Sequence, residues 1–416
     1  HQTLRALIDW SYDLLSAAEQ MVLDRLSVFA GGWTLEAAEA VTPAGDPGDA
    51  AEWQVLDHLA ALVGKSLVLA DEIQGSTRYR LLETVRHYAA ERLARRPGSE
   101  PDRTRAAHRD HYLALAETAG RHLRGPDEAL WLDRLEAEFD NIRAALAFSL
   151  ADPDGAEPGL RLAAGLHWFC NMRGHGVEIL QALDALLERP GARMPTRARA
   201  RALNASCHLR DRFGDDSAVP AMAGEAITIA RGLADDAITA DALSELCWFR
   251  SEHGDLPAAL AQIDEAVALA RRAGDPRLIA DLLGHRAVFT GEAGDLGASF
   301  ADQEEALALS RAAGDNYRLA ITLANFAVDE LAAGELRAAR AHLQEANMLA
   351  DNLGYPNLSA GLRENLGFVD LVDADPRNAR RLFLDSLDTA RITGVKSSYS
   401  RGALLGLALA AGADSD

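Results

Sequence analysis

The sequence has few cysteines, lysines and aromatic residues and no long apolar run, and each scarcity narrows the class of protein. Its three cysteines, Cys170, Cys207 and Cys247, show no CxxC spacing. This argues against a disulfide framework or a zinc site and fits a reducing cytoplasm. No apolar run reaches about 18 residues, so we expect no membrane-spanning segment. No secretory signal opens the chain.

Basic residues are also scarce relative to acidic ones. The chain carries 42 Lys and Arg against 63 Asp and Glu, a net charge of −21, and its only lysines are Lys65 and Lys396. Broad contact with a nucleic-acid backbone or an anionic membrane requires clustered cations. We therefore expect neither as a partner of this region.

The residues that are abundant favour helices, and they repeat. Alanine, leucine and arginine dominate, which favours an all-α fold. Glycine followed by an acid recurs every 40 residues, and a second series interleaves the first; the pairs are Gly214-Asp215, Gly254-Asp255, Gly294-Asp295 and Gly334-Glu335, then Gly274-Asp275 and Gly314-Asp315. Gly174, Gly354 and Gly394 extend the two series. A fixed period of this length indicates stacked helical units, which offer binding surfaces.

One repeat illustrates the expected hairpin. Residues 238–253 show helical periodicity, Gly254-Asp255 interrupts it, and Pro257 falls in the first turn of the next helix, where the missing N–H costs nothing. Each turn aspartate is placed to cap the helix that follows. Small residues recur at three positions of each unit, namely seven residues before its first glycine, five residues after it and twelve residues after it. Close packing of the two helices requires small residues at such positions.

These columns resemble the tetratricopeptide repeat (TPR), although the period here is 40 residues rather than about 34. The resemblance implies an α-solenoid of TPR-like helical hairpins over residues 159–416.

The N-terminal residues 1–96 have a different organisation. We expect helices over 4–15, 17–30, 35–41 (capped by Thr34) and 53–63, with a Pro/Gly/Asp loop over 43–49. Apolar alternation around the turn Gln74-Gly75 predicts a β-hairpin with strands at 67–69 and 78–82. A closing helix over 85–95 completes a winged helix.

Three segments of this domain resemble a known family. Residues 3–41, LVGKSLV (62–68) and RYRLLETVRHYAAERL (78–93) are similar to the winged helix of STAND-class (NB-ARC) ATPase transcription regulators, the AfsR-like and LuxR-type large regulators. Residues 108–150, which contain GPDEALWLDRLEAEFDNIRAAL (125–146) and lie within a helical linker at 97–158, are similar to the linker of those proteins.

The resemblance implies a cytoplasmic protein with an ATP- or ADP-binding domain upstream of His1, on which the winged helix docks. The repeat array would then be the sensor. Relatives carry Met-His-Asp where this chain has Leu81-Leu82-Glu83. We therefore do not expect Leu82 to contact a nucleotide phosphate.

The resemblance also points to ligand-binding residues, because the first helix of each TPR hairpin lines the concave face. The candidates are Asn204, His208, Ser244, Glu245, Trp248, Arg250, His285, Arg286, Asn325 and Asn365. Trp248 and its polar neighbours would hold a ligand with an apolar body and polar ends. In the alternative interpretation, Trp248 packs between repeats and the polar groups are solvated.

No motif indicates catalysis. Gly64-Lys65-Ser66 imitates the end of a P-loop, but Leu59 stands where the motif needs its first glycine. His108 and His111 have metal-ligand spacing without an evident third ligand. The helix over 53–63 carries Asp57 and is preceded by Glu52, which disfavours DNA binding by the winged helix. We expect no enzyme activity, no metal and no cofactor in this chain.

The leading hypothesis is a regulatory region whose superhelix binds a small-molecule inducer or a partner protein or peptide. The alternative is a stand-alone TPR scaffold for protein–protein interaction.

Overall fold

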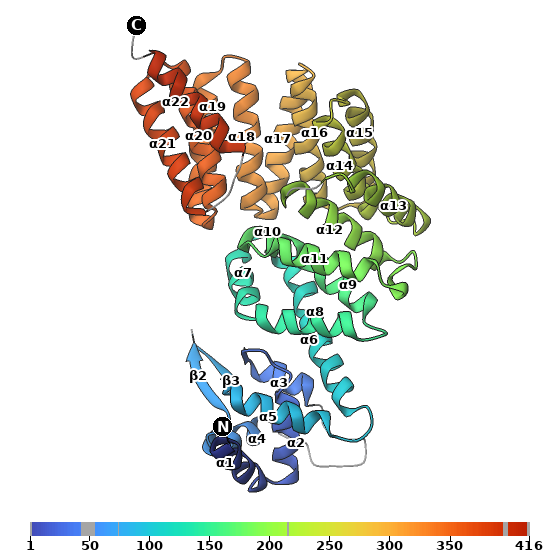
Figure 1. Ribbon diagram of the computed structural model, residues 1–416. Coiled ribbons are helices and arrows are strands. Elements are labelled where there is room, and N and C mark those ends of the chain that lie inside the picture. The colour runs from blue at the N-terminus through green and yellow to red at the C-terminus, as the bar shows by residue number, and fades with distance from the viewer. Residues whose placement is uncertain (1, 43–54, 74, 214–215, 394–397, 414–416) are drawn as a thin grey trace. The chain divides into compact units, whose positions relative to one another are not determined.

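The structure is a computed structural model that describes residues 2–42, 55–73, 75–213, 216–393 and 398–413 (Figure 1). The chain forms two compact units. The first comprises residues 1–121 and 130–194, and the second comprises residues 122–129 and 195–416. The predicted domain boundaries at 96 and 158 stay predictions.

The first unit begins with the winged helix that the sequence predicts. Its helices are α1 (Gln2–Asp13), α2 (Ala17–Leu26), α3 (Leu35–Val41), α4 (Val55–Gly64) and α5 (Glu83–Ala94). Strands β2 (Leu69–Ile73) and β3 (Ser76–Arg80) form the hairpin, and β1 (Gly32–Trp33) pairs antiparallel with the other edge of β3. The sheet order is therefore β1-β3-β2. The predicted loop over 43–49, the start of the helix over 53–63 and Gln74 lie outside the described residues.

Local signals explain these element boundaries. The Thr34 side chain accepts a hydrogen bond from the Ala37 amide, so α3 begins where the sequence predicts. Ser16 and Glu19 form a reciprocal capping box at α2. Phe29 stacks on fully buried Trp33 at 5.0 Å between ring centroids, which anchors β1 in the core.

The helices that follow complete the first unit. They are α6 (Glu100–His122), α7 (Glu128–Ala137), α8 (Phe139–Ala151), α9 (Ala156–Gly165), α10 (His167–Arg173), α11 (Gly176–Leu187) and the short 3-10 helix Pro190–Ala192. Buried Glu138 pairs with Arg78 of β3 and accepts hydrogen bonds from Tyr112 (2.9 Å) and Asn141 (3.0 Å). This network joins the sheet to α6 and α8.

The second unit is a series of helical hairpins. The first helices are α12 (Arg197–Phe213), α14 (Asp236–Glu252), α16 (Pro276–Glu292), α18 (Asn316–Ala332) and α20 (Pro356–Val372). Their partners are α13 (Val219–Gly232), α15 (Leu256–Ala273), α17 (Leu296–Ala313), α19 (Leu336–Leu353) and α21 (Pro376–Thr393), and α22 (Ser398–Ala413) follows. Figure 1 shows them stacked side by side, from α12 to α22. The all-α prediction, with a small sheet in a winged helix and a TPR-like solenoid, is confirmed.

The periodic turns work as the glycine–acid pairs predict. Gly254 and the next five turn glycines have φ between +65° and +87°, which L side chains rarely adopt. Asp255, Asp275, Asp295 and Asp315 each accept a backbone hydrogen bond at a helix N-terminus, whereas Glu335 makes no such bond. The predicted turn residues Gly214, Asp215 and Gly394 lie outside the described residues.

Two further features repeat along the hairpins. The small residues twelve positions after the turn glycine, such as Ala266 and Ala306, are fully buried. Exposed ion pairs also join successive second helices at a constant separation of 34 residues. They are Arg231–Glu265 (2.6 Å), Arg271–Glu305 (2.7 Å) and Arg311–Glu345 (3.1 Å). We call this series the outer ladder.

None of the helices that the structure describes is long and apolar enough to span a membrane.

Candidate functional site in the repeat unit

The first helices of adjacent hairpins bring polar side chains together. Helices α12, α14, α16 and α18 each pack against the next first helix as well as against their own partners. Asn204 of α12 donates to the Asp241 carboxylate (2.8 Å) and the Ile238 carbonyl (3.2 Å) of α14. One helix further on, the Ser244 hydroxyl and His285 Nδ1 are hydrogen-bonded at 2.8 Å. Three of the predicted residues therefore lie in one row.

An arginine from another part of the chain completes this row. Arg124 lies in the segment 122–129, which belongs to the repeat unit. Its guanidinium donates two hydrogen bonds of 2.7 Å to the two oxygens of Asp281. It also donates to Asp315 Oδ2 at 2.7 and 3.0 Å. Arg318 also forms an ion pair with Asp281. Two guanidinium groups thus balance two carboxylates, and we call these four residues the arginine clamp.

The segment 122–129 is fitted closely against the repeat helices. Arg124 has φ +63°, a left-handed conformation that costs a non-glycine residue free energy. Its amide donates to the side chain of buried Glu128 at 3.2 Å. A Cβ on Gly314, which has φ +65°, would lie 3.0 Å from Pro126, so a side chain here would strain the backbone and press on Pro126.

Burial and charge set the protonation states of the cluster. Burial alone would raise the pKa of Asp281, but the charges of Arg124 and Arg318 outweigh it and hold that pKa well below its usual range. Asp241 is hydrogen-bonded to the neutral amide of Asn204, and burial and the Glu245 charge raise its pKa to about 6. Burial and the charge of Arg318 lower the pKa of His285 to about 3. The imidazole is therefore neutral at pH 7.

Trp248 packs at the edge of this cluster. Its ring makes edge-to-face contacts with His285 (5.3 Å between centroids) and Phe289 (5.0 Å). It is partly buried against the apolar core of α14 to α17. These contacts agree with the interpretation that Trp248 packs between repeats, and they also place its ring beside the imidazole. His208 lies 3.7 Å from the Glu245 carboxylate.

Other predicted site residues lie elsewhere. Arg286 forms a bidentate ion pair with Asp302 of α17 (2.7 Å) and a second pair with Asp264 of α15 (3.0 Å). It therefore points to the second helices, away from the row. Among the residues that the structure describes, the hydrogen bonds and ion pairs of the cluster involve neither Arg250 of α14 nor the half-buried Asn325 and Asn365 of α18 and α20. A ligand-binding role for these residues stays a prediction.

Sequence reasoning missed the arginine clamp. It identified Asp315 only as a helix cap, a function that Asp315 also has, since it accepts a hydrogen bond from the Arg318 amide at 2.9 Å. The only local signal was Gly125-Pro126 directly after Arg124, which marks a turn. Nothing in the sequence relates that turn to residues more than 150 positions away.

Comparison with known proteins supports both parts of the fold. Residues 15–94 match the family described as a winged helix-turn-helix domain. "Putative HTH-type transcriptional regulator Rv0890c" of Mycobacterium tuberculosis (strain ATCC 25618 / H37Rv) is 45% identical over 189 residues, which cover 45% of this chain and 20% of that protein. "Uncharacterized protein Rv0894" of the same strain is 42% identical over 110 residues, covering 26% of this chain and 27% of that protein.

Among solved structures, the chain resembles a Signal Transduction ATPase with Numerous Domains (STAND) protein with a tetratricopeptide repeat sensor, PH0952 from Pyrococcus horikoshii. The TM-score is 0.54 at 14% identity, over 97% of this chain and 60% of that one. At 14% sequence identity, this similarity is evidence for the fold alone. The chain spans about a fifth of the length of the first curated relative that it matches.

Proposed function

We propose that this chain is the regulatory region of a signal-transducing ATPase that controls transcription. In this proposal the repeat unit senses an inducer or partner, and the winged helix docks on a nucleotide-binding domain elsewhere in the whole protein. The match to a winged helix-turn-helix family and a relative named as a transcriptional regulator support a regulatory role. The TPR-like fold supports a binding role for the array.

The observation that carries the sensing proposal is the arginine clamp. The row of first helices, which the sequence predicts as the ligand face, holds the chain's own segment 122–129 through Arg124. A ligand with a cationic group could satisfy Asp281 and Asp315 in place of Arg124. The inducer or partner would then compete with the segment, and its binding would free residues that continue into α6 and α7.

The surface of α4 supports docking rather than DNA binding. This helix, which would enter a DNA groove, contains no Arg or Lys. The residue directly after this helix, Lys65, is paired with Glu19 at 2.5 Å. Specific binding to DNA relies on cations at phosphates and base edges. We therefore expect no salt-sensitive binding of this chain to duplex DNA, measured by fluorescence anisotropy between low and physiological salt.

The sensing proposal is tested by competition. A panel of metabolites and arginine-containing peptides is screened by thermal shift against the wild-type chain and Arg124→Ala. If segment 122–129 occupies the ligand position, a ligand of the cluster binds Arg124→Ala more tightly than wild type, because no internal competitor remains. Arg231→Ala, which removes an exposed arginine of the outer ladder, is the matched control.

The outcome also separates the two hypotheses for the array. Stabilisation by a metabolite, lost in Asp281→Asn, supports a small-molecule sensor. Stabilisation by the peptides alone supports a protein-interaction scaffold. A ligand that binds wild type and Arg124→Ala equally would show that segment 122–129 does not cover the ligand site.

A further inference from the structure

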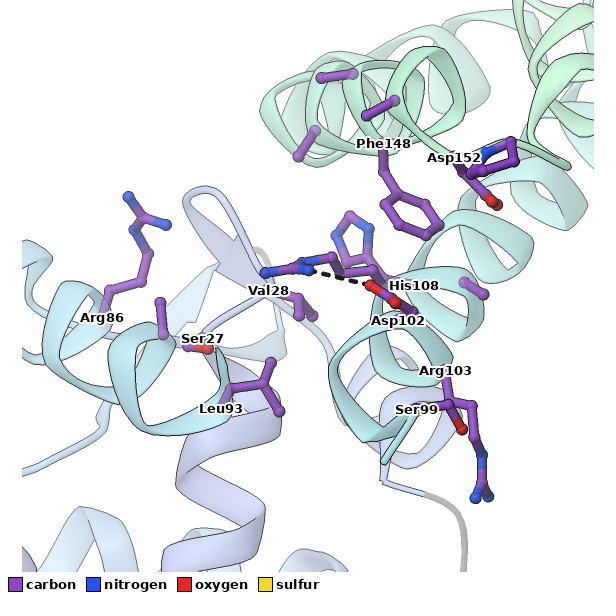
Figure 2. A pocket seen from close by; sticks show the side chains of 17 residues that line it. Ser27, Val28, Arg86, Leu93, Ser99, Asp102, Arg103, His108, Phe148 and Asp152 are labelled. Atoms are coloured by element: carbon purple, nitrogen blue, oxygen red, sulfur yellow. Dashed lines mark hydrogen bonds and ion pairs between the residues drawn. The ribbon is translucent and has the colours of Figure 1, made fainter. Parts of the chain in front are cut away.

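A cavity in the first unit is not used by the proposed sensing function. It has a volume of about 890 Å³ and lies among α5, α6 and α8, with side chains from all three helices around it (Figure 2). Small-molecule sites usually measure about 300–1,000 Å³. Its size therefore suits a small molecule rather than a segment of another protein.

The walls of this cavity are mostly apolar. Val28, Leu93 and Phe148 line it together with several alanines of α5, α6 and α8. Figure 2 shows Leu93 on α5 and Phe148 on α8, on different sides of the cavity. The short side chains of Ala144 and Ala147 leave room along α8. Such walls would bind the apolar body of a ligand.

Cations line the cavity although the whole chain is strongly acidic. Arg86, Arg103 and Arg105 all contribute to its lining. Arg105 is held by exposed Asp102 at 3.3 Å, a weak type of surface pair. The other acid of the lining, Asp152, is already paired with Arg109 at 2.9 Å. Arg105 can therefore turn to an anionic group of a ligand at little cost.

A buried imidazole closes part of the cavity wall. His108 lines the cavity and is only 3% exposed, and its ring packs on Phe29 and Tyr112. Burial lowers the pKa of His108 to about 4, so the ring is neutral at pH 7. The ring therefore adds wall to the cavity and no charge.

We propose that this cavity binds a small organic anion, with an apolar body between α5 and α8 and its anionic group at Arg105. The arrangement combines apolar walls and a charge that complements the ligand, as in other small-molecule sites.

Two matched fluorescent probes test this site in the 416-residue chain. The first is 8-anilinonaphthalene-1-sulfonate, an apolar anion, and the second is N-phenyl-1-naphthylamine, which has the same rings without the sulfonate. We expect saturable binding of the anion at one site, at least about tenfold tighter than binding of the neutral probe. Absence of saturable binding, or equal affinity for the two probes, would overturn the proposal.

Substitutions locate the probe. Ala147 is exposed on α8, so Ala147→Trp should fill the cavity without disturbing the core and abolish binding. Ala147→Glu gives a second variant, which repels the anion. Arg105→Glu should weaken binding at least about tenfold, whereas Arg95→Glu, an equal charge change outside the cavity lining, should not. If the Arg105 and Arg95 variants bind alike, the anion site is not here.

Discussion

Removing Arg124 should release segment 122–129 from the repeat unit. The side chain makes four N–H···O contacts of 2.7 to 3.0 Å with the carboxylates of buried Asp315 and largely buried Asp281. Removing one partner of a buried ion pair costs about 3–5 kcal/mol. Arg318 still compensates Asp281, and water can enter once the segment leaves, so we expect the lower end, about 3 kcal/mol. This corresponds to about a hundredfold change in the equilibrium that holds the segment.

Hydrogen exchange measures this equilibrium directly. The amides of residue 124 and Glu128 are hydrogen-bonded within the segment, to the Glu128 side chain and the Gly125 carbonyl. In Arg124→Ala they should exchange about a hundredfold faster than in wild type. Arg231→Ala, which breaks an exposed pair, should leave them unchanged.

A glycine variant separates the guanidinium from the backbone. Arg124→Gly loses the same contacts but relieves the left-handed strain at φ +63°, worth about 1 kcal/mol. Its segment should therefore exchange more slowly than that of Arg124→Ala. Wild-type exchange rates in Arg124→Ala would refute the clamp as the contact that holds the segment.

The remaining predictions concern pH and helix capping. Burial raises the pKa of Glu364 to about 7, so the folded state still binds a proton that the unfolded state releases near pH 4.5, and stability is lost as pH rises to 7. In urea titrations, Glu364→Gln should therefore raise the free energy of unfolding by up to about 3 kcal/mol at pH 8 and leave it unchanged at pH 4. The pKa of His108 in the folded state is about 4, below its value in the unfolded state. The free energy of unfolding should therefore fall by up to about 3 kcal/mol between pH 6.5 and pH 4, and His108→Gln should remove this pH dependence. Asp255→Ala should lower the free energy of unfolding by about 1 kcal/mol, whereas Glu335→Ala, at the equivalent position without a capping bond, should have almost no effect; equal losses would refute the capping argument.

The hairpins could be predicted because their signals are local. A glycine that adopts positive φ and an acid that caps the next helix act within a few residues of each other, as Gly254 and Asp255 do. Strand β1 could not be predicted in this way. It has two residues, and its conformation depends on pairing with β3, for example Trp33 with Tyr79.

The candidate site was predictable only in part. The columns of the first helices identified Asn204, Ser244 and His285, because the repeat fixes which helix face they share. The partners of Arg124 depend on how a distant turn packs against α16 and α18, which no period encodes. The direction of Arg286 was not predictable either, since Asp264 and Asp302 lie on neighbouring second helices.

The outer ladder has a consequence for how such a chain can evolve. Helix α15 contains Glu265, which pairs with the preceding repeat, and Arg271, which pairs with the following one. Helix α17 has the same arrangement with Glu305 and Arg311. A gene duplication of one 40-residue unit would therefore insert the acceptor for one ion pair together with the donor for the next. The array can gain or lose whole units while every ion pair of the outer ladder keeps both of its charged residues.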